Sequence, residues 1–324
     1  MLSMEVIFLK NFDDIKQGIN DLGLVLGFFD GVHIGHVQLI SYARSNTKKG
    51  SLGVFTFDKP LKTIEGCLMN IDDKIEAMRN LDVDYLFIVQ CDDNFKEMSY
   101  VKFVDTVLKV FNPTKIFCGP DFRFGHEAKG DVTYLKQRFS QVYVLNYVND
   151  HYENKVSSTR IKELIKEGNI KEANRYLGRP YKMFGAVVHG LNNGQIIGFP
   201  TANLLPSVDY VIPNNGVYFT KTEINGFVYN SVTNIGIHPT IEKLNKPAIE
   251  TYIIGYEGNI YGENVSLYFY EKERDETKFD SLDELKKRIS EDIDNCEEFF
   301  KYKGWFLLFC LIKLCDFDNL IRLH

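Results

Sequence analysis

Two histidines, His33 and His36, lie three residues apart in the string GFFDGVHIGH. The apolar run before them, at residues 22–28, predicts a buried strand, and an amphipathic run from Val37 predicts a helix. A turn between a strand and a helix N-terminus suits a phosphate, because backbone N–H groups and the helix dipole face the anion there. Two imidazoles beside it can stabilise the charge that develops in phosphoryl or nucleotidyl transfer. For a motif this short, an accidental match is the alternative.

Two further stretches carry polar chemistry in the first half of the chain. GPDFRFG at residues 119–125 brackets a carboxylate, an arginine and two aromatic rings between glycines, a set able to hold a planar ring beside a nucleotide. An equal alternative is a loop whose phenylalanines turn into the core. VSSTRIKEL at residues 156–164 offers hydroxyls and cations at a helix start, which indicates either a polyphosphate site or simply a capped helix.

Together these strings resemble the flavin adenylyltransferase branch of the HxGH nucleotidyltransferase superfamily. The resemblance implies that His33 and His36 are catalytic. It implies flavin binding by Asp58, Asp121, Phe122 and Arg123, and ATP binding by Gly27, Phe29, Asp30, Gly35, Ser158, Thr159 and Lys162. The chain departs from the family at Lys162, where the family has arginine, and at TFDKP (residues 56–60), where it has TFDPHP.

Composition limits the class of protein. The 324 residues suffice for two domains, and 44% hydrophobic with 25% charged residues is typical of globular chains. A net charge of -6 argues against a non-specific nucleic-acid partner. Six cysteines without a CxxC pair predict reduced thiols in a cytoplasmic protein. We see no signal peptide and no apolar run long enough for a bilayer, and we expect no membrane partner.

The elements that must position the first set of residues alternate between strands and helices. We predict strands at 22–28, 52–57, 85–90 and 115–118, and helices from 37, at 71–81 and at 100–111. This alternation favours a parallel sheet, in which ligands bind beyond the carboxyl ends of the strands. Residues 27–36 and 119–125 are therefore expected at the same edge of the sheet.

The pattern changes beyond a break near Gly178, after two short helices at 161–176. Strands are predicted at 181–188, 216–222, 227–234, 250–256 and 264–270, and a helix at 283–300. Short strands with Gly/Asn turns favour a small antiparallel barrel. We therefore predict an α/β chain with a parallel-sheet domain at 1–178, a β-barrel domain at 179–300 and an atypical apolar tail at 301–324.

The barrel's candidate chemistry lies in GFPTAN at residues 198–203, which follows a glycine-containing run at 190–194. Such a loop can wrap phosphates through backbone N–H groups, and threonine and asparagine oxygens suit Mg²⁺. Alone, the string reads better as a turn with a buried threonine. Three other motifs accompany it: NGVY at 215–218, NIGIHPT at 234–240 and a strand beginning ETY at 250.

These motifs resemble riboflavin kinase in their order and spacing. The resemblance implies that ATP is bound by Gly190, Gly198, Pro200, Thr201 and Asn203, with Mg²⁺ on Thr201 and Asn203. It makes Glu250 the base that deprotonates the ribityl 5′-hydroxyl, and Arg274 a flavin-binding residue. The alternative for Glu250 is an exposed strand carboxylate. Gln195 departs from the arginine that is common in that loop.

Over residues 5–300 the chain is similar to the bifunctional bacterial riboflavin kinase/FAD synthetase family. The resemblance implies that the barrel phosphorylates riboflavin to FMN, and that the first domain adenylylates FMN to FAD with release of pyrophosphate. The implied ligands are riboflavin, FMN, FAD and ATP, with Mg²⁺ as cofactor; an oligomer is compatible with the sequence. Two alternatives remain: a kinase whose first domain no longer adenylylates, and a flavin-binding module without turnover.

Overall fold

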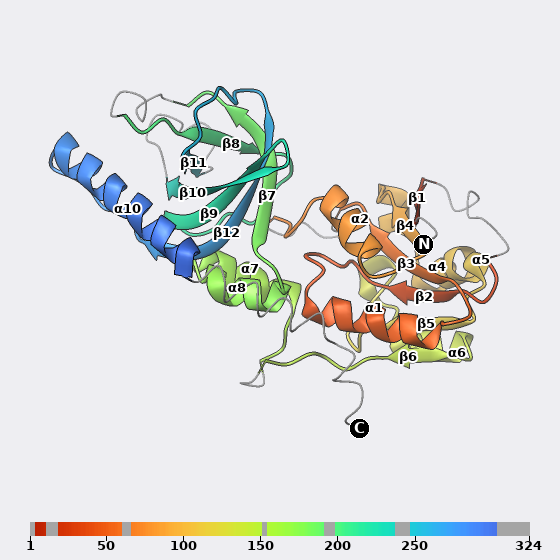
Figure 1. The fold of residues 1–324 in the computed structure, drawn as a ribbon. Coiled ribbons are helices and arrows are strands. Elements are labelled where there is room, and N and C mark those ends of the chain that lie inside the picture. The colour runs from red at the N-terminus through yellow and green to blue at the C-terminus, as the bar shows by residue number, and fades with distance from the viewer. Residues whose placement is uncertain are drawn as a thin grey trace. The chain divides into compact units, whose positions relative to one another are not determined.

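The computed structural model describes residues 4–10, 19–59, 66–150, 154–190, 198–236 and 247–302 (Figure 1). The chain divides into two compact units, Met1–Arg160 and Ile161–His324. Five features singled out in the sequence lie wholly or partly outside the described residues, namely Pro60, the glycine-containing run at 191–194, Gln195, residues 237–240 of NIGIHPT and the tail from 303 onward. The domain limits expected near 178 and 300 stay predictions.

The first unit is built on a six-stranded sheet in the order β1-β4-β3-β2-β5-β6, with every pair parallel. The strands are β1 (Glu5–Leu9), β2 (Gly23–Leu26), β3 (Leu52–Phe57), β4 (Tyr85–Val89), β5 (Lys115–Cys118) and β6 (Val142–Val144). The parallel sheet confirms the prediction. The two outermost strands, β1 and β6, were not predicted; each pairs with only one neighbour.

The helices of this unit include the three predicted ones, with two differences, and three short ones that were not predicted, at 93–96, 126–128 and 132–138. They are α1 (Ile34–Asn46), α2 (Ile71–Arg79), α3 (Asp93–Lys96), α4 (Tyr100–Phe103), η2 (Val104–Leu108), α5 (Lys109–Phe111), η3 (His126–Ala128) and α6 (Val132–Arg138). The helix predicted at 100–111 contains a π-helical segment, η2. Helix α1 begins at Ile34 rather than Val37, so His36 belongs to its first turn.

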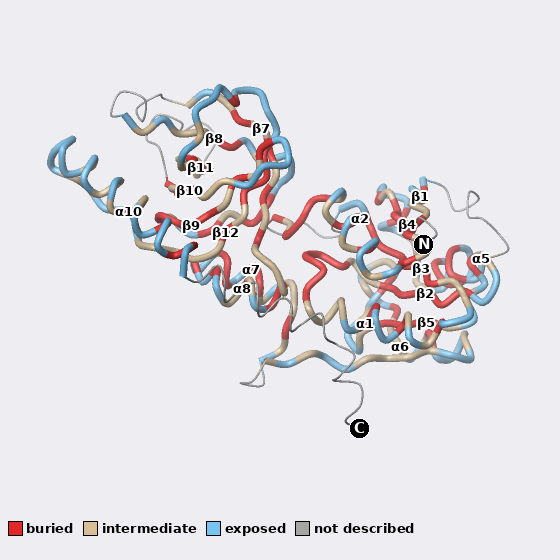
Figure 2. The backbone as a smooth tube through the Cα atoms, viewed as in Figure 1, coloured by how far each residue is buried: buried red, intermediate tan, exposed pale blue. Residues whose placement is uncertain are grey.

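The sheet is buried on both faces, as parallel sheets are. One face carries Leu24, Leu26 and Phe55, which join one core cluster, and the other carries Val25 and Val54, which join a second. Figure 2 shows the central strands as buried and the outer helix surfaces as exposed. Strands β2 and β3 are therefore rigidly held, and they position the turns that follow them.

The second unit is a closed barrel in the order β10-β11-β8-β7-β12-β9, with antiparallel pairs throughout (Figure 1). Its strands are β7 (Tyr181–Val188), β8 (Ala202–Pro206), β9 (Gly216–Ile224), β10 (Phe227–Gly236), β11 (Ala248–Ile253) and β12 (Asn264–Arg274). Its helices are α7 (Ser158–Lys166), which spans the division between the units, α8 (Ile170–Leu177) and α10 (Leu282–Tyr302). The predicted antiparallel barrel is confirmed.

The two faces of the barrel wall differ in chemistry. Inside, buried hydroxyls bond to one another across the strands, with Thr220 Oγ1 lying 2.8 Å from both Ser231 Oγ and Thr233 Oγ1. Outside, Phe219 packs on Phe299 of α10, with ring centroids 5.0 Å apart. Side chains alternate between faces along each strand, so α10 covers one consistent set of outward positions.

Two expectations from composition can be compared with the described residues. The cysteines among them, Cys67, Cys91, Cys118 and Cys296, are all free. Burial raises the pKa of Cys118 to about 12, so this thiol is unreactive at neutral pH. In the part of the chain that the structure describes, no helix has both the length and the apolar character to cross a membrane.

Helix α8 is fastened to the barrel by one amide. Asn174 Nδ2 donates a hydrogen bond to Phe269 O on β12 (2.9 Å), and Asn174 Oδ1 accepts one from Tyr181 N on β7 (2.7 Å). Tyr181 begins β7 and is paired with Phe269, so the two bonds join α8 to the barrel where the pairing of β7 with β12 ends.

We predict that Asn174→Ala lowers the free energy of unfolding by about 1–3 kcal/mol, because it removes the hydrogen bonds that join α8 to two backbone groups of the barrel. Urea denaturation followed by circular dichroism measures the loss. The matched control is Lys171→Ala, an exposed position on the same helix, which should change stability by less than about 0.5 kcal/mol. Equal effects of the two substitutions would contradict this role of Asn174.

Candidate active sites

The strand order of the first unit reverses at β2. Strand β2 is hydrogen-bonded to β3 on one side and to β5 on the other. The chain runs from β2 outward through β3 and β4, then returns to the opposite side as β5. Ligands bind in sheets of this kind beyond the carboxyl ends, where the strand order reverses. GFFDGVHIGH follows β2 and GPDFRFG follows β5, so the expectation that they share this edge is confirmed.

The turn after β2 has an unusual backbone that is held in place by burial. Phe29 and Val32 have positive φ angles of 54° and 36°, which cost energy for residues other than glycine. Both side chains are buried in the core. Asp30 Oδ1 accepts a hydrogen bond from Leu68 N (2.8 Å), and Gly27 N donates to Phe55 O (3.2 Å). Strain of this kind, paid at a strand end, is typical of functional turns.

The two histidines lie together at the start of α1. His33 is the N-cap residue and His36 lies in the first turn, with their rings stacked at a centroid distance of 3.6 Å. Gly35 lies between them, and a Cβ there would come within 3.2 Å of the His33 ring. The rings of Phe29 and His36 meet edge to face, with their centroids 5.1 Å apart. The pair therefore presents two imidazoles and the helix N-terminus to the same place.

A hydrogen bond brings the third predicted stretch to this turn. Ser158 Oγ donates to Asp30 O at 2.8 Å, across 128 positions of sequence. Ser157 Oγ accepts from Arg160 N at 3.3 Å, so the helix is also capped, as the alternative interpretation expected. Thr159 is exposed on α7, and Lys162, one turn further, is buried.

The DFRFG stretch divides between core and surface. Phe124 is buried in the core, and Phe122 stacks on it with centroids 5.6 Å apart, so the alternative of an inward-turned phenylalanine pair holds for these rings. Asp121 and Arg123 are exposed. Asp121 Oδ2 lies 2.7 Å from Lys155 Nζ. The charged residues of the motif therefore stand at the carboxyl end of β5, with the aromatic ones beneath them.

A residue that the sequence analysis missed, Lys74 of α2, joins the ends of β2 and β3. Its Nζ donates to Phe28 O (2.9 Å) and Phe57 O (3.3 Å), and lies 4.4 Å from the centroid of the Phe28 ring. Burial lowers the pKa of Lys74 from 10.5 to about 8. The available signal was a lysine in line with Ile71 and Met78 on the apolar face of the helix.

The next turn is tied down as well. Asp58 follows β3, and its Oδ1 accepts a hydrogen bond from Cys91 N at 3.0 Å. Asp58 N donates to Val89 O at 3.0 Å. The Asp58 carboxylate therefore links the carboxyl ends of β3 and β4, which fixes the turn that begins the TFDKP departure.

In the barrel, strand register lines up the polar candidates. Glu250 of β11 pairs with Asn203 of β8 on one side and with Asn234 of β10 on the other. The row continues from Asn234 to Val217 of β9 and from there to Arg274 of β12. Directly paired residues project to the same face of a sheet. We call these five residues the cross-strand row.

A cavity of about 310 Å³ lies over this row on the side that α10 covers. Its polar lining includes Thr201, Asn234, Glu250, Arg274 and Asp292. Its apolar walls come from Phe199, Val217, Val232, Tyr252, Phe279, Leu285, Ile289 and Ile293. Glu250 is half-buried in this wall, which contradicts the alternative of an exposed strand carboxylate. A planar apolar ring with polar groups at its rim suits such a cavity.

The remaining barrel candidates lie beside the cavity rather than in its lining. Gly190 touches Asn203, because a Cβ at Gly190 would come within 2.2 Å of Asn203 Nδ2. Gly198 has a positive φ of 89°, and Pro200 follows it directly before Thr201. The structure thus brings Thr201, Glu250 and Arg274 to one cavity. Asn234 and Asp292 join them although neither was assigned a role from the sequence.

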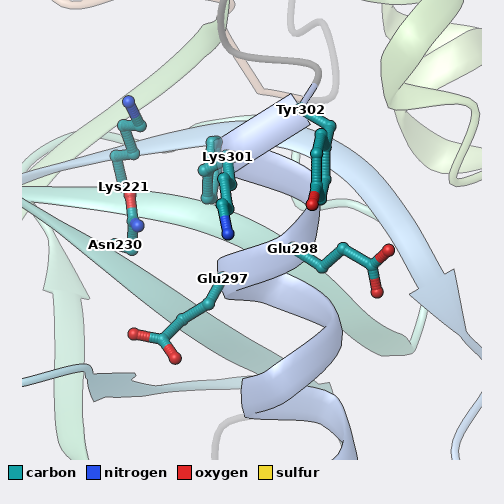
Figure 3. A pocket seen from close by; sticks show the side chains of 7 residues that line it. Lys221, Asn230, Glu297, Glu298, Lys301 and Tyr302 are labelled. Carbon is teal, nitrogen blue, oxygen red and sulfur yellow. The ribbon is translucent and has the colours of Figure 1, made fainter.

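A second hollow lies at the other end of α10 (Figure 3). It is lined by both signs of charge, including Lys221 of β9 and Glu297, Glu298 and Lys301 of α10. None of the residues singled out in the sequence lies there. Its walls carry no convergent polar group of one kind, so the cavity over the cross-strand row is the better candidate for chemistry.

Comparisons with known proteins find matches over both parts of the chain. The profile described as FAD synthetase matches residues 16–160, and that of riboflavin kinase matches residues 177–300. The bifunctional riboflavin kinases/FMN adenylyltransferases of Listeria monocytogenes and Bacillus subtilis are 34% and 32% identical to this chain, each over 86% of it and 92% of their own length. The Escherichia coli K12 protein of the same name is 30% identical over the same shares.

One solved structure extends the likeness to the fold. A crystal structure described as a macrolide-efflux protein from Streptococcus pneumoniae has a TM-score of 0.82 and 32% identity, covering 92% of this chain and 99% of that one. That description concerns transport, whereas both profiles and the three relatives above concern flavin cofactor synthesis. The matches to both profiles and to these relatives concern the chain as a whole and assign no role to single residues.

The buried amine of Lys74 generates a pH prediction. Its pKa is about 8 in the folded chain, against 10.5 for the ordinary amine. Between these values the unfolded chain holds a proton that the folded chain has lost, so stability rises with pH there; below about pH 8 both states are protonated and this dependence vanishes. The free energy of unfolding of the unaltered chain, measured relative to that of Lys74→Met, should increase by about 2 kcal/mol between about pH 7.5 and about pH 9.5.

Urea denaturation of both proteins at the two pH values provides the measurement. The Lys74→Met variant controls for every other titrating group, because the two chains differ only at residue 74. Parallel pH dependence in the two proteins would show that Lys74 keeps its ordinary pKa, contrary to its burial.

Proposed function

The chain belongs to the family of bifunctional riboflavin kinases/FMN adenylyltransferases, and on that premise we propose which of its residues carry each reaction. It is an enzyme with two activities, phosphorylation of riboflavin to FMN and adenylylation of FMN to FAD. The observation that carries our assignment is that each unit holds a group of reactive side chains of its own. The stacked histidine pair lies in the first, and Glu250, flanked by two amides, lies in the second.

We assign riboflavin phosphorylation to the cavity over the cross-strand row. The ribityl 5′-oxygen attacks the γ-phosphorus of ATP, the bond from that phosphorus to the bridging oxygen breaks, and ADP leaves. The hydroxyl proton passes to the Glu250 carboxylate, because an alcohol must lose its proton as the new bond forms. The neighbours Asn203 and Asn234 support this role, since their amides can orient the carboxylate and the phosphate. The apolar walls would receive the flavin ring, with Arg274 at its edge.

The donor set near Glu250 fits Mg²⁺. Thr201 offers a hydroxyl oxygen and Asn203 an amide oxygen, both hard ligands of the kind that this ion prefers. Among the described residues, no group of three or more histidine, cysteine or carboxylate side chains is placed to hold a metal. A metal that arrives with nucleotide phosphates needs only one or two protein ligands. When bound, Mg²⁺ would neutralise charge on the phosphates of ATP.

We assign adenylylation to the turn after β2. An oxygen of the FMN phosphate attacks the α-phosphorus of ATP, the bond to the β-phosphate oxygen breaks, and pyrophosphate leaves. The nucleophile is already an anion, so no general base is required. His33 and His36 would stabilise the charge that develops at the α-phosphate, aided by the N–H groups at the start of α1.

The groups around the histidines would hold the nucleotide. Gly27, Phe29, Asp30 and Gly35 give the turn its shape. Ser158, which is bonded to Asp30, would bind the leaving pyrophosphate together with Thr159 and Lys162. A lysine at 162 supplies charge without the two-pronged geometry of an arginine. The bond from Ser158 to Asp30 supports a shared site for Ser158 and the turn.

Flavin binding in the first unit is proposed for the residues at the ends of β3 and β5. Asp58 and Asp121 already bond to Cys91 N and Lys155 Nζ, so a flavin would bind beside these pairs or displace them. Arg123 lies 3.5 Å from Asp131 Oδ2 and is exposed enough to reorient. Phe122 supplies a half-buried aromatic face. Their place beyond the carboxyl ends of β3 and β5, the two strands that flank β2, supports the proposal.

We further propose that the enzyme acts in the cytoplasm on riboflavin, FMN and ATP, without a nucleic-acid or membrane partner. The free thiols among the described residues suit a reducing compartment. The net charge of -6 disfavours non-specific contact with nucleic acid. An oligomeric assembly is compatible with these features.

The assignment of one reaction to each unit predicts separable losses. His36→Ala should reduce FAD formation from FMN by at least about 100-fold and leave FMN formation from riboflavin unchanged, because only the adenylyl transition state loses a stabilising group. Glu250→Gln should reduce FMN formation by at least about 100-fold and leave FAD formation from supplied FMN unchanged, because it removes the base. Chromatography of the flavins measures both reactions in each variant.

Two substitutions of the same types, at residues to which we assign no role, serve as controls. His126→Ala removes another histidine of the first unit, and Glu263→Gln removes an exposed carboxylate of the second. Both should keep both activities. If His36→Ala or Glu250→Gln abolished both reactions with an unchanged circular dichroism spectrum, the assignment of one reaction to each unit would be wrong.

A further inference from the structure

We propose that Asp292 of α10 is a positioning residue for riboflavin phosphorylation, which holds the Arg274 guanidinium at the cavity that contains Glu250. The inference rests on the proposed function of that cavity. Neither the cross-strand row nor the sequence motifs include Asp292, and its carboxylate would act through Arg274 rather than on a reacting atom.

Both oxygens of the Asp292 carboxylate accept hydrogen bonds from the Arg274 guanidinium. Arg274 Nε lies 3.0 Å from Asp292 Oδ1 and 3.2 Å from Oδ2, and Arg274 Nη2 lies 2.7 Å from Oδ2. Two-pronged arginine–carboxylate pairs fix orientation as well as distance. The Asp292 side chain is only 3% exposed, and that of Arg274 is 16% exposed. The pair is therefore screened little by water.

The bonds to Asp292 leave some N–H donors of Arg274 for a ligand. An arginine has five N–H donors. Within the described chain, Nε and one N–H of Nη2 are used by Asp292, and one N–H of Nη1 donates to Asp275 O at 3.0 Å. Two donors thus remain, one on each terminal nitrogen. Because the third nitrogen is fixed, these two have a fixed direction and can select an acceptor at the edge of a flavin.

The setting of Asp292 argues against a purely structural purpose. Leu285, Ile289 and Ile293 line the same cavity from α10, so Asp292 interrupts an apolar helix face. Burying a charge there costs free energy, and a well-packed apolar residue is often as stable as a buried ion pair. Packing alone therefore does not explain a carboxylate at this position. Orientation of the arginine that shares the cavity does.

A second cation shares the carboxylate. Arg288 Nε lies 3.1 Å from Asp292 Oδ1, and Arg288 Nη1 lies 3.3 Å from Glu291 Oε2. Arg288 is not among the residues that line the cavity, whereas Arg274 is. Arg288 therefore stabilises the buried carboxylate from the far side without a donor for the ligand, which makes it a matched control.

The test compares Asp292→Asn with Arg288→Gln in the full chain, with riboflavin and Mg-ATP as substrates. Asp292→Asn keeps the size of the side chain and weakens the grip. We expect its KM for riboflavin to rise about tenfold, a loss of one charge-assisted bond. Its KM for ATP and its conversion of FMN to FAD should stay within about twofold of the unaltered chain. Arg288→Gln should leave the riboflavin KM within about twofold.

A double variant shows whether Asp292 acts through the arginine. In an Arg274→Gln background, Asp292→Asn should raise the riboflavin KM no further, because the group it positions is gone. Additive effects of the two substitutions would overturn the proposal, as would an unchanged riboflavin KM in Asp292→Asn. If Asp292→Asn does not fold, Asp292→Glu decides: it keeps the charge, and a riboflavin KM raised as much as in Arg274→Gln overturns the proposal.

The outcomes separate this inference from the function on which it rests. If the unaltered chain forms no FMN from riboflavin, the proposed function of the cavity is wrong. If the unaltered chain forms FMN and Asp292→Asn behaves like Arg288→Gln, the function stands and the positioning role is wrong.

Discussion

Strand register is the constraint on which both candidate sites depend. In the barrel, Glu250 lies between Asn203 and Asn234 only because β11 pairs with β8 and β10 in one register. A slip of one residue would turn Glu250 to the other face of the wall, among the buried hydroxyls. In the first unit, the pairing of β2 with β5 sets two turns side by side that are nearly ninety positions apart in sequence.

The two units also share a device, a single buried charge on the apolar face of a helix. Lys74 of α2 uses its amine to join the backbone ends of β2 and β3. Asp292 of α10 uses its carboxylate to fix Arg274 at the cavity. Burying a charge costs free energy unless the charge is hydrogen-bonded or paired. We therefore infer that each of these two charges serves to hold its bonded partner in place. In both units the partner belongs to a candidate site.

Much of this architecture is predictable because it depends on short sequence patterns. The bounds of β3, β5 and β7 follow from short apolar or alternating runs between clear turns. Strand β8 was not predicted, because Ala202 and Asn203 belong to a string that resembles a loop, and only pairing with β7 and β11 makes it a strand. Helix α1 was placed three residues late, since the glycine of the histidine motif weakens its helical pattern.

The candidate residues also divide into those that the sequence predicts and those that only the fold reveals. Motifs in the sequence point to His33, His36 and Glu250, whereas Lys74 and Asp292 carry no motif. Their roles arise from partners at Phe28 and Arg274, which only the fold brings near. The most direct test of the whole account is chromatography of flavins after the purified chain is incubated with Mg-ATP and either riboflavin or FMN. We predict FAD from both; FMN that accumulates from riboflavin while supplied FMN stays unchanged would contradict an active first unit.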